Sequence, residues 1–154
     1  MKQRGTQHLL RFLGVQVLLA AVAALGATSA MASGHAQSQA AAPIKTTSAH
    51  ILVTPKGKTL YVFAADPKGK STCSGECAKF WPPRLVPSGR TVPAKLPGVP
   101  GTFGTITRTD GTREPTYDGA PLYTFLEDKK AGDMIGQGLL ASGGYWWVVV
   151  AAGK

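Results

Sequence analysis

Two aspartates, Asp66 and Asp128, are the residues of this sequence whose type and repetition most directly suggest chemistry. Carboxylates that lie close together split their pKa values, so that one can donate a proton while the other accepts one. A hydrolase that uses this pair is therefore one hypothesis. Neither residue lies in the Asp-Thr/Ser-Gly context of an aspartic protease, and both follow an apolar segment, where an aspartate commonly caps a turn. Turn capping is the favoured interpretation of both.

The two cysteines, Cys73 and Cys77, suggest redox or metal chemistry. Their Cys-x3-Cys spacing is neither the Cys-x-x-Cys of thiol oxidoreductases nor the haem attachment pattern. Residues four apart on one helical turn have Cα atoms about 6 Å apart, which a disulfide tolerates. A structural disulfide is therefore the leading prediction. A periplasmic redox or metal-handling protein that uses this pair is the alternative.

Histidine adds little further chemistry. His50 is the only histidine of the expected folded region, so a Ser-His-Asp or Cys-His site would depend on it alone. A structural zinc site needs about four ligands, and only His50 and the two cysteines are available. Asp133 follows Asp128 without the ligand spacing of an EF-hand. We therefore expect no catalytic site, no cofactor and no bound metal, and we expect that the protein is not an enzyme.

The aspartates belong to a segment that the chain carries twice, with the two copies 62 positions apart. Each copy has a tyrosine, a phenylalanine two positions later and an aspartate three positions after that. These motif residues are Tyr61, Phe63, Asp66, Tyr123, Phe125 and Asp128. Aromatic residues two apart on a strand share one face and are more often core than ligand-binding. We expect two related halves, at about residues 50–83 and 105–150.

Short apolar segments separated by turn residues predict antiparallel β-structure. The expected strands are 51–54, 60–63, 102–108, 112–117, 121–126 and 145–150. No segment keeps a helical period over ten or more residues. Only the stretch 71–80, around the cysteines, has room for one or two helical turns before Trp81-Pro82-Pro83 ends them. The predicted fold class is all-β, with antiparallel sheets from two hairpin-containing repeats and a short helical turn around the cysteine pair.

The N-terminal region has the composition of a secretory signal. Basic residues precede an uncharged apolar run from 12 to 30, which ends in the small-residue site Ala30-Met31-Ala32. We expect residues 1–32 to be a signal peptide, and a retained membrane anchor is the alternative. Residues 33–49 are mostly Ala, Gln, Ser and Thr, so we expect a flexible linker there. Residues 50–154 are expected to form one domain.

The charge of the exported part is positive. Without residues 1–32 the chain has 14 basic and eight acidic residues, a net charge of +6. Such a bias favours contact with an anionic cell-envelope polymer or an envelope protein. The basic residues are scattered, with no run longer than Lys129-Lys130, so we do not expect nucleic-acid binding. We also expect no membrane span once the signal is removed.

Three tryptophans, Trp81, Trp146 and Trp147, are candidates for a binding surface. Trp146 and Trp147 are neighbours on one expected strand, so their side chains point to opposite faces. An exposed tryptophan would offer a stacking surface for a sugar ring or for a partner protein.

These motifs resemble a family of exported bacterial proteins called secreted repeats of unknown function, also described as predicted lipoproteins with a Yx(FWY)xxD motif. Both copies of the motif satisfy that pattern. The run Cys73-x3-Cys77-x3-Trp81-Pro82-Pro83 resembles the family's first repeat, and Asp118-Gly119-x2-Leu122-Tyr123 resembles its second. The resemblance covers about the whole mature domain, and the chain departs from it in having no lipobox cysteine. It implies a repeat fold outside the cytoplasm but no activity.

From the residues and the resemblance together we predict an exported protein, periplasmic or extracellular. We expect its β-repeat domain to be a non-enzymatic binding or structural module of the bacterial cell envelope.

Overall fold

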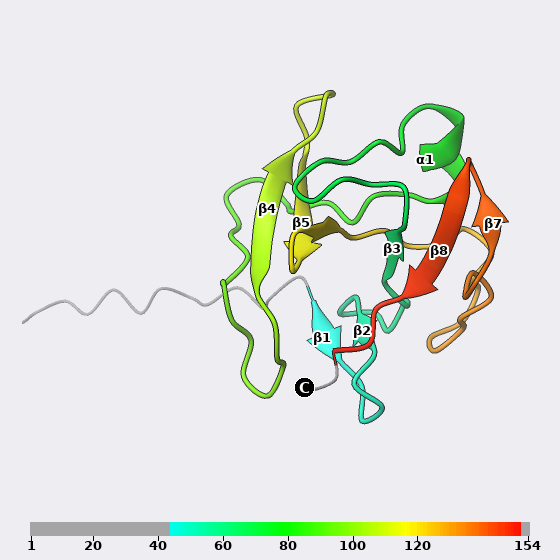
Figure 1. Cartoon of the computed structure of the whole chain (residues 1–154). Coiled ribbons are helices and arrows are strands. Elements are labelled where there is room, and N and C mark those ends of the chain that lie inside the picture. The colour runs from blue at the N-terminus through cyan, green and yellow to red at the C-terminus, as the bar shows by residue number, and fades with distance from the viewer. Residues whose placement is uncertain (1–43, 152–154) are drawn as a thin grey trace, which may run out of the picture. The chain divides into compact units, whose positions relative to one another are not determined.

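The computed structural model describes residues 44–151, which fold into antiparallel sheets (Figure 1). The predicted signal peptide, at residues 1–32, and residues 33–43 of the predicted linker lie outside the described residues. The elements are β1 (Lys45–Thr46), β2 (Leu52–Val53), β3 (Tyr61–Phe63), α1 (Glu76–Phe80), β4 (Phe103–Thr107), β5 (Arg113–Tyr117), β6 (Ala120–Pro121), β7 (Leu140–Ala141) and β8 (Gly144–Val148).

Three small sheets make up the described part of the chain. β1 pairs with β2, β8 lies between β3 and β7, and β5 lies between β4 and β6. All of these pairs are antiparallel. The one described helix, α1, has five residues and contains Cys77. The predicted all-β antiparallel fold with a helical turn at the cysteine pair is therefore confirmed.

The fold begins earlier than the sequence suggested. Ile44 is buried in the core with 2% of its surface exposed. Lys45 lies opposite Val53 and Thr46 opposite Leu52. Residues 44–49, which we predicted to be linker, therefore belong to the domain. Polar and small residues surround Ile44 in the sequence, so the burial of one isoleucine gives no periodic signal.

The second motif segment has less regular pairing than the strand predicted for residues 121–126. Its regular part is only β6, and isolated bridges join Tyr123 to Tyr61 and to Pro83. The segment is therefore placed by single pairs of residues on two sides rather than by a continuous ladder.

A short hairpin was also missed. β7 lies between the predicted strands 121–126 and 145–150, where no strand was expected, and pairs with β8. Ser142 and Gly143 join the two strands, with φ of 54° and 87°. Positive φ at both central residues is the geometry of a type I′ hairpin turn.

β3 separates two hydrophobic clusters, as expected for a strand that is apolar on both faces. One cluster is mainly aliphatic and includes Leu52, Leu60, Leu122 and Val149. The other is mainly aromatic and contains Tyr61, Phe63, Cys73, Trp81, Tyr123, Phe125 and Trp146. The aromatic cluster holds every aromatic ring of the duplicated motif, so the motif organises this half of the core.

Candidate functional site

The two motif tyrosines meet at the centre of the domain. The backbone N–H of Tyr61 donates to the carbonyl of Tyr123 at 2.9 Å, and the N–H of Tyr123 donates to the carbonyl of Tyr61 at 2.9 Å. A reciprocal bond of this kind is the antiparallel bridge that relates two strands by a local two-fold axis. The two copies of the motif are therefore paired with each other.

Each tyrosine reaches the aspartate of the other copy. The Tyr61 hydroxyl donates to Asp128 Oδ2 at 2.8 Å, and the Tyr123 hydroxyl donates to Asp66 Oδ2 at 2.6 Å. We call these two bonds the crossed pairs. They join residues 67 and 57 positions apart, so each ties the first repeat to the second.

The aspartates also close the loops that follow them. Asp66 Oδ1 accepts from the backbone N–H and the hydroxyl of Thr72, at 2.7 and 2.6 Å. Asp128 Oδ1 accepts from the backbone N–H of Ile135 at 3.0 Å. Each carboxylate thus accepts a downstream backbone N–H, but across loops of six and seven residues rather than in the tight turns that we predicted. The bond from the opposite tyrosine was not predicted.

The crossed pair at Asp128 is buried. Tyr61 has none of its surface exposed, and Asp128 has 1%. Burial raises the pKa of Asp128, and the hydrogen bonds from Tyr61 and from the Ile135 N–H oppose that rise. Burial, followed by the bond to Asp128, raises the pKa of Tyr61. The Tyr61 hydroxyl therefore donates to Asp128 inside the core, an arrangement that links the two repeats.

Two of the three predicted binding tryptophans belong to the core. Trp81 and Trp146 have 1% and 0% of their surface exposed. Their ring centroids are 3.9 Å apart, and the rings are parallel to within 1°. Phe63 stacks on Trp146, and Phe125 stacks on Trp81, so each phenylalanine packs on the tryptophan of the other repeat. These two tryptophans cannot offer a binding surface, because both of their faces are covered.

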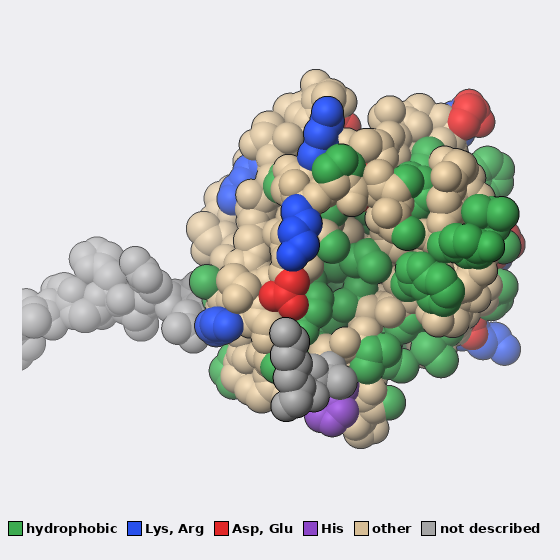
Figure 2. Space-filling view, viewed as in Figure 1, with side chains coloured by type: hydrophobic (Ala, Val, Ile, Leu, Met, Phe, Trp, Pro, Cys, Tyr) green, Lys and Arg blue, Asp and Glu red, His purple; other side chains and the backbone are tan. Residues whose placement is uncertain are grey.

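Trp147 lies on the surface with a second aromatic residue. Tyr145 and Trp147 have 48% and 42% of their surface exposed, and their ring centroids are 5.8 Å apart. Leu140 lies opposite Tyr145 in the neighbouring strand and is 63% exposed. Figure 2 shows hydrophobic side chains gathered over β7 and β8 in this region. We call Leu140, Tyr145 and Trp147 the aromatic face.

The predicted disulfide is present. The Cα atoms of Cys73 and Cys77 are 5.2 Å apart, and a bond joins the two sulfurs. Cys73 is buried, with 1% of its surface exposed, and Cys77 is partly buried. The carbonyl of Cys73 accepts from Arg108 Nη2 at 2.6 Å, which fixes the bridge to the second repeat.

A buried ion pair, missed in the sequence, supports one crossed pair. Arg108 Nη1 donates to Glu114 Oε2 at 2.6 Å and to Ser71 Oγ at 2.7 Å. Ser71 in turn lies 2.6 Å from the Tyr123 hydroxyl. Burial raises the pKa of Glu114 to about 7, against the opposing effect of Arg108. The signal for this pair was available, because Arg108 ends one predicted strand and Glu114 lies in the next.

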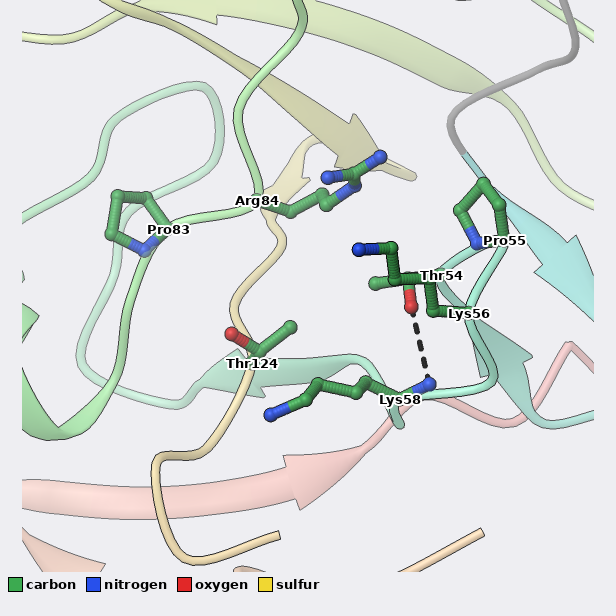
Figure 3. A pocket seen from close by; sticks show the side chains of 7 residues that line it. All are labelled: Thr54, Pro55, Lys56, Lys58, Pro83, Arg84 and Thr124. Atoms are coloured by element: carbon green, nitrogen blue, oxygen red, sulfur yellow. Dashed lines mark hydrogen bonds between the residues drawn. The ribbon is translucent and has the colours of Figure 1, made fainter. Parts of the chain in front are cut away.

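One pocket contains residues that sequence reasoning did not single out. Three basic side chains and two threonines line most of it, and the pocket has a volume of about 410 Å³ (Figure 3). These residues are Thr54, Lys56, Lys58, Arg84 and Thr124. Two prolines complete the lining, and none of the lining residues is acidic. We call this site the cationic pocket.

Two further structural observations concern metals and membranes. No cluster of three or more His, Cys, Asp or Glu residues positioned to hold a metal occurs among residues 44–151. His50 is exposed, at the edge of the fold, with a φ of 59°. Within the same residues no helix has the length and apolar character needed to cross a membrane.

Comparison with protein families identifies the class that this repeat geometry represents. The model of the family described as secreted repeat of unknown function matches residues 43–84 and 104–150. The chain belongs to that family, and the two matched segments correspond to its two repeats. The predicted family, repeat fold and export are therefore confirmed. Comparison with curated proteins and with solved structures finds no match.

Proposed function

We propose that this exported domain is a non-enzymatic binding module of the cell envelope and that its partner is an anionic, sugar-containing envelope polymer. The observation that carries the proposal is the exposed Tyr145–Trp147 pair. Two adjacent rings on one strand face can cover the C–H face of a sugar ring. The tyrosine hydroxyl and the indole N–H remain available for hydrogen bonds to sugar hydroxyls.

The contrast with the core supports this assignment. The rings of the duplicated motif are all buried, as are Trp81 and Trp146. The two rings of the aromatic face are therefore additional to those that pack the fold. Leaving apolar surface in water forgoes about 25 cal/mol for each Å² that could be buried, so an exposed pair of this size favours a role in contact.

The charge of the domain favours an anionic partner. Residues 44–151 contain 13 basic and eight acidic residues, a net charge of +5. At ordinary ionic strength this excess attracts a polyanion over roughly 8 to 10 Å. Polymers of the bacterial envelope combine sugar units with negative charge, so they match both the aromatic face and the positive bias.

Binding of a purified anionic cell-wall polymer tests the proposal. Trp147→Ala should weaken binding without lowering the melting temperature much, because Trp147 is half-exposed. Leu85→Ala is the matched control, since Leu85 is an exposed apolar residue, with 40% of its surface exposed, outside the aromatic face. Equal effects of the two substitutions, or no binding by the unmodified protein at moderate salt, would remove the proposal.

The proposal treats the disulfide as a structural bridge rather than a redox centre. Burial of Cys73 and the bond from Arg108 to its carbonyl support that role. The reduction potential decides between the two, because structural disulfides lie below about −300 mV. A potential close to that of the compartment's oxidants would instead favour the redox alternative.

A further inference from the structure

The cationic pocket lies between the two repeats. Thr54, Lys56 and Lys58 come from the turn between β2 and β3, and Arg84 comes from the segment after Trp81. Thr124 is the residue between the tyrosine and the phenylalanine of the second motif. Figure 3 shows the three basic side chains around one opening, with the threonines beside them. The core therefore fixes the backbone on which each of these groups is mounted.

Several hydrogen-bond donors of the pocket still have protons that no group of the described chain accepts. Lys58 Nζ donates one hydrogen bond to the carbonyl of Asp128 at 3.2 Å, which leaves two of its protons. Thr54 Oγ1 accepts from the backbone N–H of Lys58 at 3.1 Å, so its own proton remains available. Within the described chain, the ammonium of Lys56 makes no hydrogen bond or ion pair. The pocket thus has several donors that a ligand can take.

Charge in the pocket has no internal compensation from its lining. Three cations line one concavity without an acidic neighbour in it. Burial lowers the pKa of Arg84, which means that its charged form loses solvation there. An anion in the pocket would gain from the positive potential of the three cations.

The second repeat shows that the fold does not require this charge. A glycine with positive φ precedes both motifs, with a φ of 82° at Gly57 and 85° at Gly119, but the turns differ in type, because Asp118 also has a positive φ of 48° and Lys56 does not. At the spacing of 62 positions, Lys56 corresponds to Asp118 and Lys58 corresponds to Ala120. The second repeat therefore folds with an acidic residue and an alanine at the positions that align in sequence.

The position of Thr124 also differs between the two repeats. Thr124, in the pocket, corresponds to Val62 of the first motif. Val62 packs against the aliphatic cluster, whereas Thr124 lines the pocket. Of the two places that align in sequence, only the first-repeat turn with Thr124 beside it has the hydroxyl and the cations, which is the pattern expected of a specialised site.

We propose that the cationic pocket binds a phosphate group carried on a sugar or polyol. An arginine and two lysines match the charge of a phosphate, and arginine recognises its oxygens with paired hydrogen bonds. The volume of about 410 Å³ is within the range of small-molecule sites and exceeds what inorganic phosphate alone fills. The threonine hydroxyls suit the hydroxyls of the carrier. This inference rests on the pocket alone, so it can fail while the aromatic face still binds polymer.

Calorimetric titration of the exported protein with glycerol 3-phosphate, inorganic phosphate and glycerol tests the proposal. Glycerol 3-phosphate should bind at least about tenfold more tightly than glycerol, because charge-assisted bonds supply most of the affinity. Its affinity should also exceed that of inorganic phosphate and should fall as salt is raised. Equal binding of inorganic phosphate and glycerol 3-phosphate would overturn the assignment of a carrier group.

Substitutions that keep the fold separate a loss of ligand binding from a loss of folding. Lys58→Ala and Thr124→Val introduce the residues found at the equivalent positions, and Lys56→Gln removes a charge that makes no internal contact. Each lysine variant should lose at least about tenfold in affinity for glycerol 3-phosphate. Lys56→Gln should do so at an unchanged melting temperature, whereas Lys58→Ala also loses the bond to the Asp128 carbonyl, so its affinity is measured well below its own melting temperature. Lys70→Gln, an exposed lysine outside the pocket, should keep the full affinity. Unchanged affinity in Lys56→Gln would overturn the proposal.

Discussion

Tyr61→Phe isolates the energetic role of a crossed pair. The substitution removes only the hydroxyl that donates to Asp128 Oδ2 at 2.8 Å and keeps the ring that packs edge-on against Trp81. Asp128 is 1% exposed, so water does not readily replace the lost donor. Removing a hydrogen bond to a charged, buried group costs about 1.5 to 3 kcal/mol. For a domain of this size, that cost lowers the melting temperature by roughly 6 to 24 °C.

Urea unfolding at pH 7, followed by tryptophan fluorescence, measures this cost. Tyr117→Phe is the matched control, because its hydroxyl donates to the neutral carbonyl of Pro100 at 2.8 Å and the residue is only partly buried. We expect the control to lose about 1 kcal/mol or less. A double-mutant cycle of Tyr61→Phe with Asp128→Asn should give a coupling energy of about 1 kcal/mol or more.

The pH dependence of the unfolding free energy that Tyr61→Phe loses gives a second check. The bond from Tyr61 opposes the rise in the pKa of Asp128 that burial causes. This bond therefore stabilises the carboxylate more than the neutral acid. The difference in unfolding free energy between the natural protein and Tyr61→Phe should shrink as pH falls through the titration of Asp128. If Tyr61→Phe loses no more unfolding free energy than Tyr117→Phe, or if the coupling energy is zero, the crossed pairs do not link the two repeats energetically.

Three further predictions concern other parts of the core. Burial raises the pKa of Glu114 from its ordinary 4.5 to about 7, so its contribution to stability is full below about pH 4.5 and is lost as pH rises through about 7. Glu114→Gln should remove this part of the pH dependence of the unfolding free energy in urea. An unchanged pH profile in the variant would contradict the prediction. Gly136→Ala should destabilise by about 1 to 3 kcal/mol, because its Cβ would lie 2.6 Å from the Trp81 ring, and a neutral effect on thermal unfolding would show that the ring can move. Replacing both Cys73 and Cys77 by serine should cost about 2 kcal/mol or less in the same assay, since the closed loop is short, and a failure to fold would show a larger role for the bridge.

The duplicated motif predicted the fold better than it predicted the contacts. Its spacing gave the two halves, and the turn chemistry of the aspartates gave their loop-closing role. The crossed pairs were not predictable, because strand alternation says which way the Tyr61 ring points but not which repeat supplies its partner. That information depends on the local two-fold axis, which only the packing of the halves creates.

The surface was harder to predict than the core. Alternation placed Trp146 and Trp147 on opposite faces of a strand but did not say which face is covered. The prediction that Trp81 and Trp146 belong to a binding surface was wrong, because rings of the other repeat cover both side chains. The sequence contained one sign of the cationic pocket, the contrast between Lys56 and Asp118 at positions that align 62 apart.

We propose that the motif holds the domain together and that the outer surface binds the partner. Paired measurements of the melting temperature and of the Kd for purified anionic cell-wall polymer test it most directly. Tyr123→Phe should lower the melting temperature and leave Kd unchanged below that temperature, since its hydroxyl is used inside the fold. Trp147→Ala should raise Kd and leave the melting temperature nearly unchanged. The reverse result, in which the motif variant loses binding at full stability and the surface variant does not, would contradict this division of roles between core and surface.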